Sequence, residues 1–275
     1  MLRHLGQCTA LIGTVALTLG TADPATAAGD DVIVPRGSPV QIAVVLDHSE
    51  LLAANGASAR NAIQMALERH GLVRGFPVEL NDFDGPCRDP AANAIVAAEV
   101  VSNPQNLAVI GHMCSPDEHV ALPIYEQAGV VTVSGSATGP LNPSFGPDVF
   151  NSVAVPDDVP GEGDAWYATV QALPSDIFWR TAYAREFGSE PTAFADLYFD
   201  AASALLDQIA AAATLDNNGN LVINRGALAA SVRSLTRSTA LGVKGVTCWV
   251  VLDNRGYRVN DPTSLQQCGN TGKGH

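Results

Sequence analysis

The sequence is poor in positive charge and in aromatic residues. Lysine and arginine total 15 against 28 aspartates and glutamates, so the formal net charge is −13, and aromatic residues make up only 6% of the chain. This acidity argues against nucleic acid or an anionic membrane surface as a partner. It is otherwise ordinary for a protein that stays in solution, so it assigns no function by itself.

Long apolar runs are also missing beyond the N-terminus, which predicts that the mature protein does not span a membrane. The N-terminus combines a basic start at Arg3, an apolar run over Ala10–Leu19 and small residues at Ala25–Ala28. This pattern is typical of a secretory signal, so residues 1–28 are predicted to be a signal peptide that is cleaved after Ala27 or Ala28. We therefore expect a periplasmic or extracellular protein.

Motifs for metal, nucleotide and nucleophilic chemistry are absent from the sequence. It has no CxxC or HExxH spacing, no phosphate-binding loop and no dinucleotide fingerprint, and Ser136 does not stand in a GxSxG pattern. An exported hydrolase would need a serine, cysteine or metal site that is not present here. We therefore predict no enzyme activity, no cofactor and no metal.

Four cysteines follow Cys8 of the predicted signal peptide: Cys87, Cys114, Cys248 and Cys268. An even number in an exported chain predicts two disulfides, and three pairings are possible. Metal binding is the alternative, and it is weaker because the four cysteines are scattered along the chain.

Strand-like and helix-like segments alternate along the first half of the chain. The predicted strands are Val40–Leu46, Phe76–Phe83, Leu107–Ile110 and Val130–Ser134. The predicted helices between them are Ala57–His70, Ala91–Val101 and Pro116–Ala128. Strict alternation of this kind predicts an α/β fold, a doubly wound parallel sheet with helices on both faces.

The second half is predicted to complete this lobe and to add a C-terminal β-hairpin. The expected elements are a strand at Asp148–Val155, a loop at Pro156–Gly163, a strand at Trp166–Val170, helices at Ser175–Phe187, Thr192–Ala213 and Arg225–Thr236, a turn at Asn217–Asn220, and hairpin strands at Val246–Leu252 and Tyr257–Leu265. In this division residues 29–39 are a polar N-terminal lead, 40–245 a single α/β lobe, and 246–275 the hairpin and tail.

The turn after Leu107–Ile110 is the predicted centre of the molecule. Ser115 is expected to cap the next helix, with Pro116 in its first turn and Glu118 completing a capping box. A strand that ends at Gly111 and leads into a capped helix directs backbone N–H groups and a hydroxyl to one place, where open α/β sheets usually bind small ligands. A capping role alone would explain Ser115 equally well.

Four stretches, in their order and spacing, resemble the branched-chain amino-acid binding proteins of ABC importers, which are type I periplasmic binding proteins: Val40–Leu46, Asn81–Pro90, Gly111–Ser115 and Val133–Pro140. More loosely, Pro191–Ile209 resembles the long return helix of that family and Gly242–Asn260 its closing strands. The resemblance implies one lobe of the two-lobed type I fold. It also implies an exported solute-binding protein that works with an ABC permease.

The same resemblance implies where a ligand binds. Ser115, Ser136, Ala137 and Thr138 fall where the family holds the carboxylate and amino groups of its ligand, and the end of the first strand reaches the same rim. We therefore expect ligand contacts from six residues: Asp47, His48, Ser115, Ser136, Ala137 and Thr138. A tight turn of small residues would explain Ser136 and Thr138 without a ligand, and His48 is more often a solvated loop residue.

The resemblance also selects among the disulfide pairings. Cys87 and Cys114 stand where the family has its first-lobe disulfide, in turns that follow neighbouring strands. We pair the remaining two, Cys248 and Cys268, across the predicted C-terminal hairpin.

The resemblance stops where the second lobe of the family begins. The chain leaves the first lobe at Val155 and returns by Trp166, whereas another lobe needs roughly 100–150 residues. We therefore expect a shortened receptor that binds an amino acid or similar small carboxylate weakly. The alternative is a single-lobe binding or scaffold module that has lost transport function and pairs with itself or another chain. Apolar surface around Phe150, Val153 and Trp166 is expected to favour a homodimer.

Overall fold

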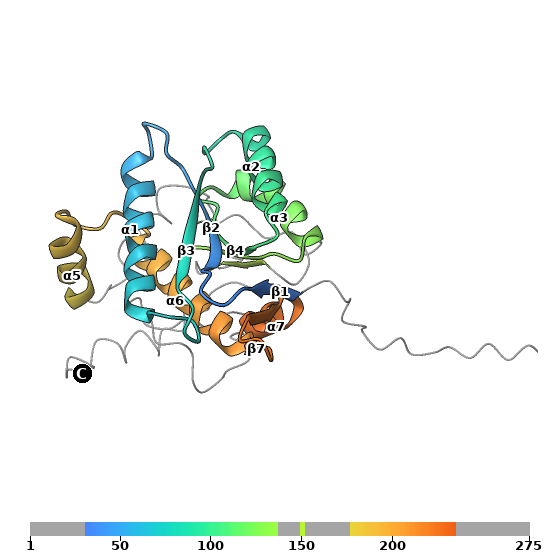
Figure 1. Ribbon diagram of the computed structural model, residues 1–275. Coiled ribbons are helices and arrows are strands. Elements are labelled where there is room, and N and C mark those ends of the chain that lie inside the picture. The colour runs from blue at the N-terminus through green and yellow to red at the C-terminus, as the bar shows by residue number, and fades with distance from the viewer. Residues whose placement is uncertain (1–30, 137–148, 152–176, 235–275) are drawn as a thin grey trace, which may run out of the picture.

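The computed structural model describes residues 31–136, 149–151 and 177–234 of the chain (Figure 1). Several predictions from the sequence lie outside these residues: the signal peptide at 1–28, Ala137 and Thr138, the strand at Trp166–Val170, the hairpin within 246–275 and the pair Cys248 and Cys268. All of these stay predictions.

A five-stranded parallel sheet forms the centre of the fold. Its strands are β2 (Val40–Leu46), β3 (Val78–Asp84), β4 (Asn106–Gly111), β5 (Val131–Ser134) and β6 (Val149–Asn151). They pair in the order β3-β2-β4-β5-β6, and each pairing is parallel. The predicted doubly wound parallel sheet is therefore confirmed.

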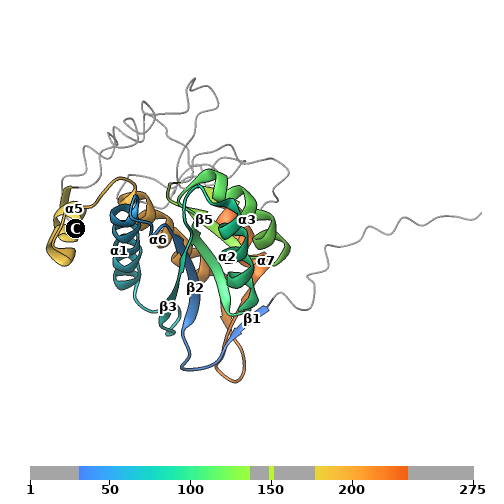
Figure 2. The same ribbon diagram turned by 90° about the horizontal axis from the view of Figure 1, so that it is seen from above.

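Helices cover both faces of this sheet (Figure 2). They are α1 (Ala53–His70), α2 (Pro90–Ser102), α3 (Ser115–Gln127), α5 (Ile177–Phe187), α6 (Ala195–Ala212) and α7 (Arg225–Ser234). Strand β2 shows how the faces divide, because successive side chains of a strand point to opposite sides. Ile42 and Val44 join the larger core with α1 and α6, and Ala43 and Val45 join the smaller core with α2 and α3.

Helix α6 is the long return helix that the sequence predicts, and it lies beside α1 in both views (Figures 1 and 2). It begins at Ala195 instead of the expected Thr192, because Phe194 has a left-handed backbone (φ 70°) that a helix cannot include. Its side chains Leu197, Tyr198 and Leu205 are all almost completely buried. The second half of the chain therefore closes one face of a sheet built by the first half.

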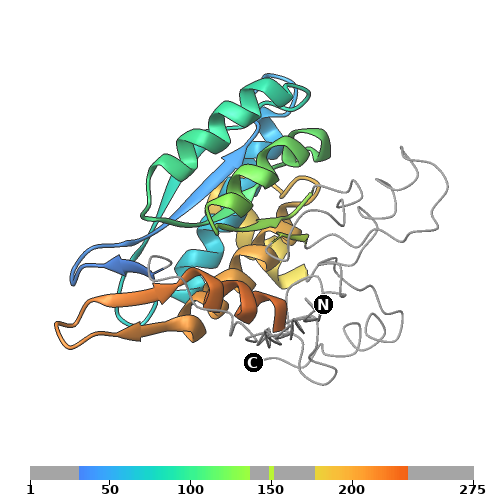
Figure 3. The same ribbon diagram turned by 90° about the vertical axis from the view of Figure 1, so that its right-hand side faces the viewer.

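A second, three-stranded antiparallel sheet was not predicted. It consists of β1 (Asp31–Val34), β7 (Ala213–Leu215) and β8 (Leu221–Asn224) in the order β1-β8-β7. Figure 3 shows the β7–β8 hairpin extending from the lobe next to β1. The predicted turn at Asn217–Asn220 joins β7 to β8, and the backbone N–H groups of Asn218 and Asn220 both donate to Asp216 Oδ1 at 2.8 Å. The predicted polar lead over 29–39 thus contains a strand.

None of the helices in the described ranges is both long enough and apolar enough to cross a membrane.

The start of α2 allows a direct test of a helix cap. Asp89 is the N-cap, and its Oδ1 accepts a hydrogen bond from the backbone N–H of Ala92 at 3.0 Å. We expect Asp89→Ala to lower the free energy of unfolding by about 1 kcal/mol, measured by urea denaturation. Asp89→Asn keeps an accepting oxygen at this position, so it should lose much less. Equal losses in the two variants would contradict the capping role.

Candidate functional site

The carboxyl ends of β2, β3 and β4 meet at one edge of the sheet, called here the strand-end rim. In the parallel register Leu46 lies opposite Asp84, and Val45 lies opposite Gly111. The rim is formed by the segments that leave these strands and β5, which are 47–52, 85–89, 112–114 and 135–136. Open α/β sheets bind ligands at such an edge, and the start of α3 points to it here.

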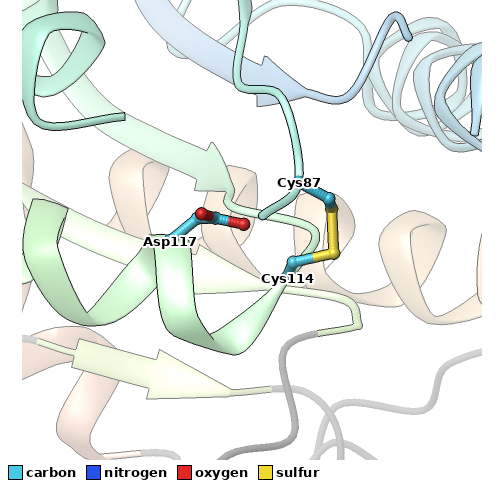
Figure 4. Close-up of side chains that lie close together, drawn as sticks. All are labelled: Cys87, Cys114 and Asp117. Atoms are coloured by element: carbon cyan, nitrogen blue, oxygen red, sulfur yellow. A yellow bond between two sulfur atoms is a disulfide. The ribbon is translucent and has the colours of Figure 1, made fainter. Parts of the chain in front are cut away.

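A disulfide between Cys87 and Cys114 joins two of these rim segments (Figure 4). It links the loop after β3 to the residue before α3, with the two Cα atoms 5.6 Å apart. The predicted pairing of these cysteines is confirmed. Beside it the Asp117 carboxylate accepts a hydrogen bond from the backbone N–H of Arg88 at 2.9 Å, so covalent and polar contacts together hold the 85–89 loop against α3.

The sulfur atoms of Cys87 and Cys114 and a carboxylate oxygen of Asp117 lie within 4.8 Å of one another, the spacing of a metal site. Metal ions bind cysteine as the thiolate, and the two sulfurs of a disulfide cannot form one. The Asp117 carboxylate also already accepts a backbone N–H. These three residues therefore have a structural role: they hold the rim segments together.

The prediction that Ser115 caps α3 is wrong. The N-cap is Cys114, which has an extended backbone (φ −115°, ψ 132°) and makes no side-chain capping bond, and Ser115 is the first helical residue. The capping box fails too, because the cap residue makes no side-chain capping bond and Glu118 stands four positions after it instead of three. The same cysteine forms the disulfide with Cys87. Pro116 lies in the first turn as predicted.

Ser136 lies at the rim, as predicted, but its hydroxyl is used within the protein. Its Oγ donates to the carbonyl of Met113 at 2.9 Å and lies 2.8 Å from the hydroxyl of Tyr198 on α6. Only 8% of Ser136 is exposed. The Tyr198 ring packs directly on Gly135, where an added Cβ would lie 2.6 Å from a ring carbon. Tyr198 therefore fixes the positions of Gly135 and Ser136 at the end of β5.

The Asp47 side chain also forms its hydrogen bonds within the protein, whereas the His48 side chain is exposed. The Asp47 carboxylate is buried and accepts backbone hydrogen bonds from Ser49 at 2.6 Å and from Cys87 at 2.7 Å. It therefore joins the end of β2 to the disulfide loop. His48 is exposed, and its backbone N–H donates to Asp84 Oδ1 at 3.1 Å.

His112 lies beneath the rim in a buried hydrogen-bond chain that sequence reasoning missed. The Asn93 side-chain nitrogen donates to the carbonyls of Pro86 (2.8 Å) and Asp89 (2.9 Å), so its oxygen is the atom that faces His112 Nδ1 at 2.7 Å. His112 Nδ1 therefore carries the proton, and Nε2 accepts from the Tyr125 hydroxyl at 3.0 Å. Burial lowers the pKa of His112 to about 3, so its imidazole is neutral at physiological pH.

Glu118 is the other strongly perturbed group in this region. Burial raises the pKa of its carboxyl to about 8, so the protonated form predominates at neutral pH. Burial also raises the pKa values of Tyr125 and Tyr198, and the charge of Glu118 adds to both shifts. Glu118 thus lies close to the residues that support His112 and Ser136. In its neutral form it adds little negative charge to the start of α3.

One signal in the sequence could have pointed to this buried layer. His112 directly follows Gly111, the last residue of the completely buried strand β4, and a polar residue in that place must be solvated or paired. Tyr198 and Asn93 had no such signal, because each looks like an ordinary helix residue and only the packing of α6 and α2 brings it to the rim.

Sequence comparison places this arrangement among known proteins. Residues 39–160 match a periplasmic binding protein family. A leucine-, isoleucine-, valine-, threonine- and alanine-binding protein of Pseudomonas aeruginosa is 36% identical over 92 residues, which is 32% of this chain and 24% of the relative. An amino acid binding protein of the same organism is 30% identical over 83 residues, 30% of this chain and 22% of the relative. The matched region thus spans about a quarter of these relatives.

Structure comparison agrees on the fold. The substrate-binding protein LivJ of a Streptococcus pneumoniae branched-chain amino acid transporter, solved with isoleucine, aligns with a TM-score of 0.64 and 14% identity over 81% of this chain and 94% of that chain. The leucine-binding protein LivK of Thermotoga maritima aligns with a TM-score of 0.62 and 17% identity over 79% and 92%. The predicted relationship to this group, and the fold it implies, are confirmed.

The disulfide should stabilise the lobe measurably. Cys87 and Cys114 are 27 positions apart, and closing a loop of that length is worth about 3–4 kcal/mol in the chain-entropy description. We expect the double variant Cys87→Ser/Cys114→Ser to lose about that much in urea denaturation. A reducing agent should weaken the unaltered protein by more than it weakens this variant, which keeps only the predicted Cys248–Cys268 pair. Equal sensitivity of both proteins to the reducing agent would contradict the assignment.

The two buried ionisable groups predict opposite effects of pH on stability. The folded-state pKa of Glu118 lies above its ordinary value, so its contribution is complete in acid and is lost as the pH rises from about 4.5 toward 8. The folded-state pKa of His112 lies below its ordinary value, so its contribution is lost as the pH falls from about 6.5 toward 3.

Glu118→Gln isolates the first effect, because glutamine resembles the protonated acid. We expect this variant to raise the melting temperature clearly at about pH 8 and little at about pH 5. Glu126→Gln on the same helix is the matched control and should show no such difference. A gain of equal size at both pH values would show that Glu118 is not the group responsible.

Proposed function

Because residues 39–160 match the periplasmic binding proteins and the described fold is that of one lobe of these proteins, we propose that this chain is an exported solute receptor that binds an amino acid or a similar small carboxylate at the strand-end rim. The observation that supports this most directly is the convergence of three strand ends and the start of α3 at one preorganised edge. An ABC permease is the partner that this function implies.

The rim has the features that a small carboxylate requires. Helix α3 begins there, and the partial positive charge of a helix N-terminus favours a bound anion. Glu118 in the first turn of α3 is mostly neutral at physiological pH and so repels an anion little. The other buried acids at the rim, Asp47 and Asp117, accept hydrogen bonds from backbone N–H groups of the rim segments. The 85–89 and 112–114 segments are fastened by the disulfide, which reduces the conformational entropy that binding would cost.

The six rim residues have different parts in this proposal. Ser115 contacts the ligand, because it occupies the first position of α3. Ser136 and Asp47 are positioning residues, since their side chains are committed to Met113, Tyr198 and backbone N–H groups. The contacts from His48, Ala137 and Thr138 remain proposals carried over from the resemblance.

A single lobe implies weak binding. Strand β6 ends at Asn151 and α5 begins at Ile177, so only the 25 residues at 152–176 lie between them. A folded lobe needs at least roughly 50 residues. A ligand at the rim therefore keeps part of its hydration, and each hydrogen bond gained is worth about 0.5–1.5 kcal/mol. We expect dissociation constants on the order of millimolar for leucine, isoleucine or valine.

The shortness of the 152–176 segment also supports a second candidate function, a binding or scaffold module that pairs with itself or another chain. In that case the other chain takes the place of the second lobe, for which the 25 residues at 152–176 are too few. Sedimentation velocity separates the two: the receptor proposal expects a monomer that binds amino acids weakly, and the scaffold proposal expects an assembly whose formation does not depend on amino acids.

Calorimetry with leucine, isoleucine, valine, threonine and alanine tests the receptor proposal. We expect Ser115→Ala to weaken binding about tenfold, the loss of one charge-assisted hydrogen bond. Tyr198→Phe should weaken binding and also lower the melting temperature, because it removes the hydroxyl that holds Ser136. The control Ser102→Ala lies on α2 and should leave affinity unchanged. The proposal would be overturned if none of the five amino acids shows saturable binding.

A further inference from the structure

A groove of about 530 Å³ lies away from the strand-end rim, near the amino ends of β2 and β4. Its floor and walls include six residues of particular interest: Gln41, Asn81, Phe83, Glu99, Asn103 and Asn106. Gln41 is the second residue of β2 and pairs in register with Asn106, the first residue of β4, whereas the rim lies where these two strands end. Along β3 the groove extends as far as Phe83. The groove, called here the amide groove, is therefore separate from the proposed amino-acid site.

Four carboxamides in the groove form a single hydrogen-bond network. The Asn81 side-chain nitrogen donates to Asn106 Oδ1 at 2.7 Å and to Gln41 Oε1 at 3.3 Å. Asn103 donates to the same Gln41 oxygen at 2.9 Å, and Asn106 donates to the carbonyl of Val100 at 2.9 Å. Asn106 is 1% exposed. The network holds the polar side chains of the groove in one arrangement before any ligand arrives.

The network leaves both donors and acceptors available toward the groove. Within the described residues, the Gln41 side-chain nitrogen and the Asn81 side-chain oxygen make no hydrogen bond, since their partner atoms in the network are the Gln41 oxygen and the Asn81 nitrogen. The exposed Glu99 carboxylate adds acceptors. The Asp82 carboxylate is paired with Arg60, so its charge is largely compensated.

This combination discriminates among kinds of ligand. An anion could use the Gln41 N–H groups but would be repelled by Glu99, and a cation could use Glu99 and Asn81 but not the Gln41 donors. A hydroxyl group both donates and accepts, so adjacent hydroxyls match all three side chains. The half-buried ring of Phe83 adds an apolar surface beside them.

We propose that the amide groove is a second ligand site, for a neutral polyhydroxylated small molecule such as a monosaccharide or a cyclitol. Its volume lies within the range of about 300–1,000 Å³ that small-molecule sites occupy. The groove is open and polar, so the affinity is on the order of millimolar. The proposal does not depend on amino-acid binding at the rim.

NMR titration of the full chain with glucose, galactose and myo-inositol tests the site. We expect saturable shifts at Gln41, Asn81 and Asn103 with concentrations up to about 50 mM, and none with putrescine or acetate as cationic and anionic probes. Gln41→Glu keeps the accepting oxygen and removes both donors, so it should weaken polyol binding at least about tenfold. Gln127→Glu, on the exposed end of α3, is the matched control and should bind as the unaltered chain does.

Two more variants separate the alternatives. Glu99→Gln should retain polyol binding within about threefold, whereas binding of putrescine that disappears in this variant would show a cation site and overturn the proposal. Ser102→Trp places a large ring at the mouth of the groove without altering the amide network, so it should abolish binding even if Gln41→Glu does not fold. Shifts confined to the rim, or no saturable shift with any polyol, would also overturn it.

Discussion

The burial of β2 on both faces and both edges is the constraint on which the rest of the molecule depends. Its residues pair with β3 on one side and β4 on the other, and its side chains enter the two hydrophobic cores alternately. A strand in this position has no freedom of register, because a slip by one residue would exchange the two cores. The ends of its neighbours are therefore fixed as well, and with them the places where the rim and the amide groove can form.

At the rim, the fixed strand ends are joined to one another by contacts that do not belong to the sheet. Asp47 accepts from the loop of β3, the disulfide joins that loop to the residue before α3, and Ser136 bonds to Met113 after β4. Polar side chains that look like ligand contacts in a sequence are thus largely occupied in shaping the edge. These contacts hold the rim segments in one arrangement, which suits the proposed binding of a ligand without a closing second lobe.

How much could be predicted depends on which contacts are local. The alternation of Val40–Leu46 and its successors, and the cap at Asp89, are short-range signals, and both the parallel sheet and the start of α2 could be predicted from them. The cap at Cys114 was not predicted, because Cys114 and Ser115 are neighbours and only the extended backbone of Cys114 shows which of them precedes the helix. Strand β1 was missed because its four residues become a strand only when β8, about 190 positions later, pairs with them.

The contact between Tyr198 and Ser136 bears on the order in which the chain can fold. The region that matches the receptor family ends at residue 160, yet the helix that covers its α1 face begins at Ala195. A nascent chain of 160 residues would have the sheet strands and α1, α2 and α3, but it would lack the α6 side chains of the larger core and the Tyr198 ring that packs on Gly135. The unit of sequence similarity is therefore smaller than the packed unit, and the larger core is completed only by residues that follow the 152–176 segment.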